Sequence, residues 1–298
     1  MTSKLFIDTS YLIFYRIYAI KAWYGRAYPD IVLTDPTLDS IFMEKYNSLF
    51  FKNIHKVLKD NKYTIPTCDW IFALDCARCD IWRYPLFPEY KENRDITRKD
   101  DVFILENIFR HTYQNILPQF CEKHGSTLIK VEHAEADDII AVSTQYCIQH
   151  IPDIHIVIIA NDHDYLQLLG NKNTTKSKKE QEAQDFFTNL LCDENDKVNT
   201  SSITIVNLQN KKLNDKSIGN DLLYKILLGD PADNIPPSFK KCGKATVQKL
   251  LDDPSLLEKK LAECGRTQYD LNCRLIDFNN IPLGIQNNIR VILEKLNL

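Results

Sequence analysis

Short apolar runs that end at carboxylates recur along the first two thirds of the chain. The earliest run, residues 4–7, closes at Asp8 and is followed by an amphipathic stretch over residues 11–22. A short apolar run that gives way to a helical period is typical of a strand followed by a helix. The pattern predicts further strands at residues 70–74, 127–131, 155–160 and 203–206.

Strands that alternate with helical patterns predict an α/β fold, in which a mostly parallel twisted sheet is flanked by helices. From about residue 221 onward the chain becomes helical with short turns, which indicates a smaller all-helical module. Between residues 171 and 202 the pattern dissolves into a stretch rich in Lys, Glu, Asn and Asp. We expect a long, flexible insertion there.

Composition limits the function classes without choosing one. The chain has 298 residues, enough for a full core, and a net charge of −3, so any nucleic-acid-binding surface must be local. Its nine cysteines are scattered, and Cys76 and Cys79 have no second pair with which to hold zinc. No apolar run reaches the ~20 residues of a membrane span, and no secretory leader is recognisable. We therefore expect an intracellular protein, cytosolic or nuclear, of cellular or viral origin, and neither secreted nor membrane-bound.

Carboxylates gather where strands end and helices begin. Glu135 and Asp138 lie three residues apart on one face of a predicted helix, and Asp137 lies between them. A helix dipole alone would favour acids in a first turn. Open parallel sheets, however, place their sites beyond the carboxyl ends of the strands, where the other acids also fall. The complete set is Asp8, Asp75, Glu135, Asp137, Asp138, Asp162, Asp164, Asp230 and Asp233.

So many like charges at one edge would raise one another's pKa unless cations neutralise them. Ligand sets made only of oxygen suit hard ions such as Mg²⁺ or Mn²⁺. Two such ions about 3.5–4 Å apart can clamp the attacking and leaving oxygens of a phosphodiester displacement. The acidic set therefore predicts a divalent-metal site of a kind that recurs in nucleases and polymerases.

Six motifs in order resemble those of the 5′ nuclease superfamily, which includes flap endonucleases, phage 5′-3′ exonucleases and the nuclease domain of bacterial DNA polymerase I. Their PIN-like fold agrees with the predicted sheet. The motifs are Asp8-Thr-Ser with Arg16, Leu74-Asp75, Phe87-Pro-Glu-Tyr-Lys-Glu-Asn-Arg94, Glu135-Ala-Asp-Asp138, Asn161-Asp-His-Asp164 and Gly229-Asp-Pro-Ala-Asp-Asn-Ile-Pro236.

The resemblance implies a structure-specific 5′ nuclease that cuts DNA near 5′ ends, flaps or junctions. It implies a PIN-like nuclease domain at residues 1–208, with a helical arch at about 84–118, and a helix-hairpin-helix-type DNA-binding module at residues 209–298. A first metal would be held by Asp8, Asp75, Glu135, Asp137 and Asp138, and a second by Asp162, Asp164, Asp230 and Asp233. The catalytic set would be Asp8, Asp75 and Asp162 together with Lys91 and Arg94, the last two contacting the scissile phosphate from the base of the arch.

The resemblance also implies contacts to DNA. Arg16 and Tyr90 are expected to touch it, and Tyr84, Phe87 and Tyr90 to stack on bases, although core packing explains Phe87 equally well. The module would bind the backbone through Lys240, Lys241, Gly243, Lys244, Thr246 and Lys249. The family hairpin that binds K⁺ has two glycines, whereas this chain keeps only Gly243. We therefore expect duplex binding and leave the K⁺ site open.

Two other functions remain open at this stage. One is a PIN-like RNA nuclease, and the other is a catalytically silent protein that binds DNA structures. Residues 286–293 loosely resemble a clamp-binding peptide, but an amphipathic helix that packs on the body explains them better. The expected partners are DNA with 5′ ends and RNA strands in hybrids, and the protein is expected to be a monomer.

Overall fold

The computed structural model describes residues 2–94, 104–169, 201–213 and 221–298. Five strands form one sheet in the order β3-β2-β1-β4-β5, and every neighbouring pair is parallel. This confirms the predicted parallel sheet. The strands are β1 (Ser3–Asp8), β2 (Trp70–Leu74), β3 (Thr127–Lys130), β4 (His155–Ile159) and β5 (Ser202–Val206).

The strand register brings the acidic strand ends together. Asp8 pairs with Ala73, two residues before Asp75. Ile7 pairs with Ile159, three residues before Asp162. Because all strands run in one direction, these carboxylates emerge at the same edge of the sheet.

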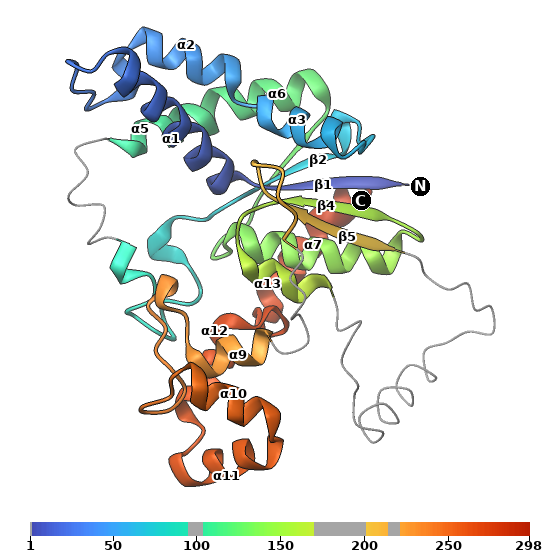
Figure 1. Cartoon of the computed structure of the whole chain (residues 1–298). Coiled ribbons are helices and arrows are strands. Elements are labelled where there is room, and N and C mark those ends of the chain that lie inside the picture. Colours follow the sequence, from blue (N-terminus) through green and yellow to red (C-terminus); the bar gives the residue numbers. More distant parts are fainter. Residues whose placement is uncertain (1, 95–103, 170–200, 214–220) are drawn as a thin grey trace.

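Helices cover both faces of the sheet (Figure 1). Successive strand residues point to opposite faces, so Leu5 and Ile7 pack into one buried cluster and Phe6 into the other. The face of Leu5 is covered by α1 (Thr9–Ala27), α2 (Ser40–Leu49), α3 (Lys52–Asp60), α5 (Leu105–His111), a π-helical turn (Thr112–Ile116) and α6 (Leu117–His124). The face of Phe6 is covered by α7 (Ala136–His150) and α13 (Leu283–Lys295).

The remaining C-terminal helices extend from the sheet as a separate group (Figure 1). They are α9 (Asp221–Leu228), α10 (Lys244–Asp252), α11 (Pro254–Cys264) and α12 (Thr267–Ile276). Leu227, Phe239, Val247 and Leu261 form part of a small core of their own. The 3₁₀ turns within the described residues are Pro36–Leu38, Thr67–Asp69, Arg78–Asp80, His163–Leu169, Pro231–Asp233 and Phe278–Asn280.

The last helix, α13, returns to the sheet. Ile285, Ile289 and Leu293 are buried with α7 in the core beneath the strands. This confirms that the apolar stripe of the C-terminal helix packs on the body, and interaction with a clamp stays an open prediction. The domain boundary at residues 208/209 stays a prediction. Helix α13 follows that boundary in the sequence, but it packs against the sheet.

The predicted arch lies partly outside the described residues, and the predicted insertion lies almost entirely outside them. Of the expected arch, the structure describes residues 84–94 and 104–118; of the expected insertion, it describes only residues 201 and 202. No helix among the described residues is both long and apolar enough to span a membrane. The eight cysteines in the described ranges are free thiols.

Candidate active site

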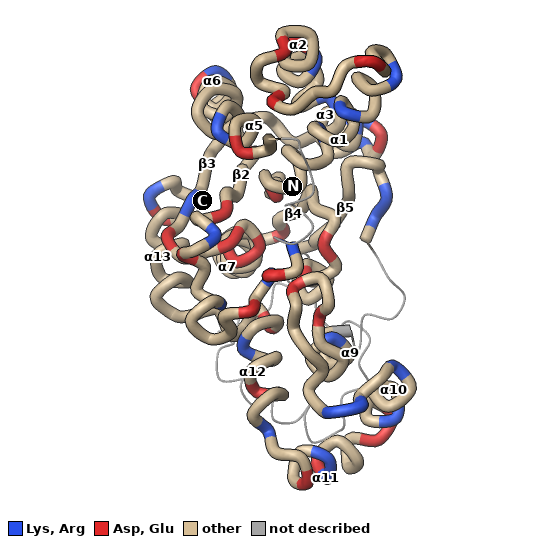
Figure 2. The backbone as a smooth tube through the Cα atoms, turned by 90° about the vertical axis from the view of Figure 1, so that its left-hand side faces the viewer, with Lys and Arg blue, Asp and Glu red and all other residues tan. Residues whose placement is uncertain are grey.

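A cavity of about 960 Å³ opens at the carboxyl ends of β1, β2 and β4. One side carries five of the predicted carboxylates and the two predicted cations: Asp8, Asp75, Glu135, Asp137, Asp162, Lys91 and Arg94. Helix α1 and the segment from α5 to the π-helical turn add an aromatic wall of Tyr11, Phe14, Tyr18, Phe109 and Tyr113. Acidic residues crowd this region between the strand ends and the C-terminal helices (Figure 2).

Asp8 and Asp75 are each held by a helix start. Asp8 caps α1, its Oδ1 accepting a hydrogen bond from the Tyr11 amide at 2.9 Å. Asp75 accepts from Ser10 Oγ at 2.5 Å and from the Ala136 amide, at the first residue of α7, at 2.7 Å. Burial, with Asp75 nearby, raises the pKa of Asp8 to about 7, and burial raises the pKa of Asp75 as well.

Glu135 has a different electrostatic environment. Its Oε2 accepts from Arg83 Nη1 at 2.8 Å and from the Tyr90 hydroxyl at 3.0 Å, while Oε1 is paired with Lys91. Burial alone would raise the pKa of Glu135, but Lys91 and Arg83 outweigh it and lower the pKa to about 2. Burial and the neighbouring Asp138 raise the pKa of Asp137 well above its ordinary value.

Asp138 lies behind the cavity. It is 0% exposed and is absent from the cavity lining. Its oxygens accept hydrogen bonds from Arg83, from Trp82 Nε1 and from the backbone amide of Glu135. Direct metal ligation by Asp138 stays a prediction, and these contacts already occupy its oxygens.

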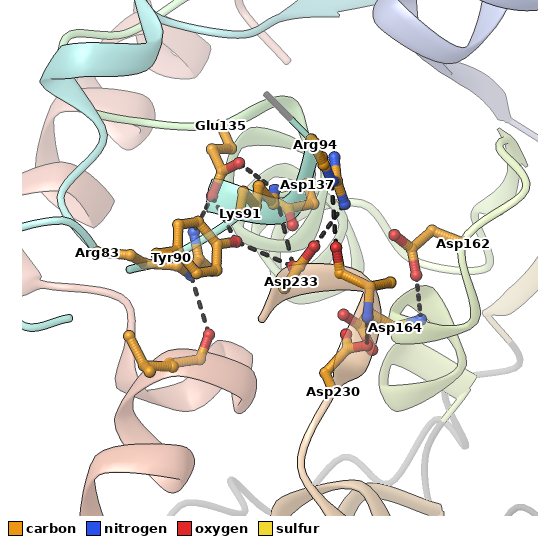
Figure 3. A network of polar contacts seen from close by, with 12 residues as sticks. Arg83, Tyr90, Lys91, Arg94, Glu135, Asp137, Asp162, Asp164, Asp230 and Asp233 are labelled. Carbon is orange, nitrogen blue, oxygen red and sulfur yellow. Dashed lines mark hydrogen bonds and ion pairs between the residues drawn. The ribbon is translucent and has the colours of Figure 1, made fainter. Parts of the chain in front are cut away.

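A second acidic group faces the first (Figure 3). Asp162 is exposed and accepts from the Asp164 amide at 2.9 Å. Lys225, on α9, pairs with both Asp164 and Asp230, the latter at 2.8 Å. Burial and the neighbouring Asp162 raise the pKa of Asp164 to about 7.

Asp233 joins the two groups. The Tyr90 hydroxyl reaches Asp233 Oδ2 at 3.1 Å, and Arg94 pairs with the same carboxylate. The Lys91 amide also donates to the Asp233 carbonyl at 2.9 Å. The loop that carries Asp230 and Asp233 thus lies against the Tyr90–Arg94 segment, although the two are about 140 residues apart (Figure 3).

The donor set fits a hard divalent ion. Oxygens of Glu135, Asp137 and Asp138 lie within 4.8 Å of one another. The pKa values of Asp8 and Asp164 are raised first by burial and then by the neighbouring Asp75 and Asp162, respectively, so negative charge at these oxygens is unfavourable without a nearby cation. Additional positive charge among carboxylate oxygens would relieve this repulsion.

Two DNA-contact predictions need correction. Tyr90 is 2% exposed and is held by Glu135 and Asp233, so its ring is unavailable to bases. Arg16 is 4% exposed and donates to Asn53 Oδ1 at 2.8 Å, so it ties α1 to α3 instead of reaching DNA. Tyr84 and Phe87 are partly buried against the same apolar cluster as Tyr90, which favours core packing for Phe87.

The predicted backbone-binding residues surround the start of α10. Gly243 is its N-cap; Lys240, Lys241, Lys244 and Lys249 are exposed, and Thr246 is half-buried. The φ of Gly243 is −90°, a conformation open to any residue, so this turn has no special need for glycine. The roles of these residues in DNA binding and the K⁺ site stay predictions.

Sequence reasoning missed Arg83 and Lys225, which pair with the predicted carboxylates. Arg83 is the single charged residue in the run from Ile81 to Pro88, which is a weak signal for a buried cation. Lys225 lies five residues before Asp230, and nothing in the sequence marks it. Both partnerships depend on the tertiary fold.

Known proteins are similar to this chain in sequence and in fold. Residues 4–195 match the family model described as "5'-3' exonuclease, N-terminal resolvase-like domain". "Ribonuclease H" of Enterobacteria phage T4 is 22% identical over 272 residues, spanning 85% of this chain and 78% of the phage protein.

Two solved T5 structures share the fold over 98% of both chains at 14% identity. One is the bacteriophage T5 flap endonuclease in a pseudo-enzyme–product complex with DNA and metal ions, with a TM-score of 0.58. The other is a T5 protein co-crystallised with metal ions, with a TM-score of 0.57. Because the family model covers well over half of the residues, the chain belongs to the 5′-3′ exonuclease family.

Proposed function

We propose that this protein is a divalent-metal-dependent 5′ nuclease that hydrolyses DNA phosphodiester bonds near 5′ ends and flap junctions. The observation that carries the proposal is the cavity in which five carboxylates face Lys91 and Arg94 at the carboxyl edge of the sheet. Family membership and the fold shared with a DNA-bound T5 flap endonuclease support it. Every carboxylate of the predicted set is present, which argues against a catalytically silent binder.

Mg²⁺ or Mn²⁺ would be held in two places. One group that offers oxygens is Asp8, Asp75, Glu135 and Asp137, all of which line the cavity. The second group is Asp162, Asp164, Asp230 and Asp233, of which Asp162 lines the cavity. Two bound ions would supply Lewis acidity at the attacking and leaving oxygens of the phosphodiester. The protein contributes the spacing of the carboxylates, since it fixes them on strand ends and helix starts.

Lys91 and Arg94 would stabilise negative charge at the scissile phosphate. At present Lys91 pairs with Glu135, and Arg94 with Asp233. These ion pairs compete with divalent ions for the same oxygens. Neutralisation of Glu135 and Asp233 would therefore leave both cations available to the substrate.

The aromatic wall replaces Tyr90 as the site for unpaired bases. Phe14 and Tyr18 on α1 face the same cavity as Phe109 on α5. Tyr18 is 49% exposed. Stacking on aromatic rings tolerates every base, which suits a nuclease that recognises structure instead of sequence.

The lysines around α10 would bind the backbone of the duplex beside the cut. Such contacts release counterions, so DNA binding should weaken steeply as salt increases. The backbone amides at the start of α10 could cap a phosphate. A K⁺ ion at the preceding turn would add to this contact.

A second substrate is suggested by the name of the phage T4 relative. "Ribonuclease H" indicates an enzyme that acts on RNA. We therefore propose the RNA strand of an RNA–DNA hybrid as a further substrate, cut by the same residues. An intracellular location and a monomeric state also remain predictions.

Cleavage of a 5′-labelled flap duplex tests the proposal. It is compared with single-stranded DNA, duplex DNA, single-stranded RNA and an RNA–DNA hybrid, each with Mg²⁺ or chelator. Asp162→Asn is the control variant, because Asp162 is exposed and its loss leaves the core intact. We expect metal-dependent cutting at the flap junction that Asp162→Asn abolishes. Structure-selective binding without cutting would indicate the silent binder, and preference for single-stranded RNA would indicate the RNA nuclease.

A further inference from the structure

The guanidinium of Arg83 is buried at the junction of the sheet and the C-terminal helices. Its side chain is 3% exposed, and it lies outside the cavity lining. It stacks over the Trp82 ring, with its central carbon 4.5 Å from the ring centroid. A fully buried cation needs partners for its charge and its N–H groups, so its contacts indicate what it does.

Asp138 is the anchor for Arg83. Arg83 Nη2 donates to Asp138 Oδ1 at 2.8 Å, and Nη1 donates to Oδ2 at 3.1 Å. This bidentate contact fixes the guanidinium and the carboxylate in one relative orientation. Trp82 Nε1 and the Glu135 amide also donate to Oδ2, at 2.9 and 3.0 Å. Asp138 therefore directs its oxygens toward Arg83 and away from the cavity.

Glu135 is held by the same guanidinium. Arg83 Nη1 also donates to Glu135 Oε2 at 2.8 Å. The other oxygen, Oε1, faces Lys91 at the cavity. Arg83 thus fixes the rotation of the Glu135 carboxylate from behind and leaves one oxygen directed toward the site.

The third contact of Arg83 crosses to the C-terminal helices. Its Nε donates to the Leu275 carbonyl at 2.9 Å, in the last turn of α12 and 192 residues away in sequence. Carbonyls in the last turn of a helix lack partners within the helix, and the helix dipole favours a cation there. The docking of α12 and the orientation of Glu135 therefore share one side chain.

We propose that Arg83 is a positioning residue, anchored by Asp138, that orients Glu135 for metal binding and couples this orientation to the docked end of α12. The inference rests on the proposed function, because that function assigns Glu135 to the metal-binding set. Loss of Arg83 should weaken metal binding although Arg83 touches neither metal nor substrate. Partners of metal ligands commonly contribute about 10–100-fold in metal affinity.

Mn²⁺ binding to the 298-residue chain tests the positioning role of Arg83 without relying on catalysis. Free Mn²⁺ is measured by electron paramagnetic resonance for the wild type, Arg83→Lys, Asp138→Asn and the double variant Arg83→Gln/Asp138→Asn, so that loss of the predicted ligand Asp138 is separated from loss of Arg83. The double variant removes both buried charges together, which avoids an isolated buried carboxylate. Thermal unfolding establishes that each variant is folded at the temperature of the titration.

We expect the double variant to bind Mn²⁺ about 10–100-fold more weakly than wild type. Arg83→Lys should lose less Mn²⁺ affinity, because lysine keeps the positive charge but cannot make the bidentate contact. Amides in the last turn of α12 should exchange hydrogen faster in both variants. The matched control is Lys4→Gln/Asp69→Asn, which removes a 2.7 Å ion pair at the start of β1 and should leave Mn²⁺ affinity unchanged.

Wild-type Mn²⁺ affinity in either folded Arg83 variant overturns the inference, as does an equal loss in the Lys4/Asp69 control. Failure of the proposed function looks different. In that case the wild type binds Mn²⁺ in an Arg83-dependent way but cuts none of the nucleic-acid substrates.

Discussion

Carboxylates of this site differ widely in proton affinity because their immediate partners differ. Asp8 and Asp164 have pKa values of about 7, raised first by burial and then by neighbouring aspartates. Glu135 is also buried, but Lys91 and Arg83 lower its pKa to about 2. The negative charge of Glu135 is therefore already balanced by Lys91 and Arg83, whereas a bound cation would stabilise the charged forms of Asp8 and Asp164.

These pKa values predict how the stability of the metal-free protein depends on pH. Because folding raises the pKa of Asp8 and Asp164, the folded state is favoured when both are protonated. This stabilisation is complete below pH 3.8, the ordinary pKa of the group, and is lost as pH rises to about 7. The lowered pKa of Glu135 has the opposite effect on stability, because its contribution is lost as pH falls from 4.5, its ordinary pKa, to about 2. In chelator, the carboxylates should therefore lower thermal stability between pH 5 and pH 7.5, and Mg²⁺ should restore it at pH 7.5.

Asp8→Asn provides the comparison, because asparagine can still cap α1. Burial lowers the pKa of His55 and His155, which acts against the carboxylates near pH 6 but equally in both proteins. The variant should gain about 1–2 kcal/mol relative to wild type as pH rises from 5 to 7.5. Parallel melting profiles for the two proteins would contradict the assignment.

Asp75→Asn should abolish cleavage while sparing the fold. The substitution relieves repulsion at the acidic edge and opens no cavity, so the free energy of unfolding should stay within about 1 kcal/mol of wild type. Initial cleavage rates in Mg²⁺ and thermal melts measure the two effects. Asp69→Asn, at the opposite end of β2, should keep full activity. Near wild-type turnover of Asp75→Asn would exclude Asp75 as a ligand.

At the scale of elements, one tight turn positions two of the predicted ligands. Gly229 ends α9 with φ +78°, and a Cβ there would lie 2.4 Å from the Ile235 carbonyl oxygen. The turn brings Asp230 opposite Ile235 in an isolated β-bridge. Backbone sterics at Gly229 therefore determine where Asp230 and Asp233 lie.

Gly229→Ala should cost about 1–3 kcal/mol and lower cleavage, because the turn must shift and carry Asp230 with it. Urea unfolding and cleavage rates at saturating Mg²⁺ measure this. The matched control is Gly25→Ala within α1, where an added Cβ meets nothing within 4 Å. Gly25→Ala should stabilise the protein by about 0.5–1 kcal/mol with unchanged activity. Equal behaviour of the two variants would refute the role of the turn.

At the scale of the whole molecule, the C-terminal helices are bound to the nuclease-type domain at two places. Helix α13 contributes Ile285, Ile289 and Leu293 to the core beneath the strands. Arg83 joins the end of α12 to the acidic residues of α7. The helical module should therefore unfold together with the sheet.

Ile289→Ala should cost about 2–5 kcal/mol, because Ile289 is 0% exposed and its loss leaves a cavity under the sheet. Val291→Ala, on the same helix but 46% exposed, should change stability by less than about 0.5 kcal/mol. Denaturant unfolding followed by tryptophan fluorescence and by circular dichroism should give one coincident transition. Two separate transitions would instead support independent units divided near residue 208.

The sequence by itself determined the positions of the five strands, the parallel sheet and the acidic residues at its edge. These follow from local hydrophobic periods and from the rule that parallel strands end at one edge. Only the tertiary structure decided that Tyr90 and Arg16 are buried, that Asp138 faces Arg83, and that Lys225 joins Asp164 to Asp230. The contact from Tyr90 to Asp233 spans 143 positions along the chain. Burial and charge pairing between distant segments arise only when the elements pack.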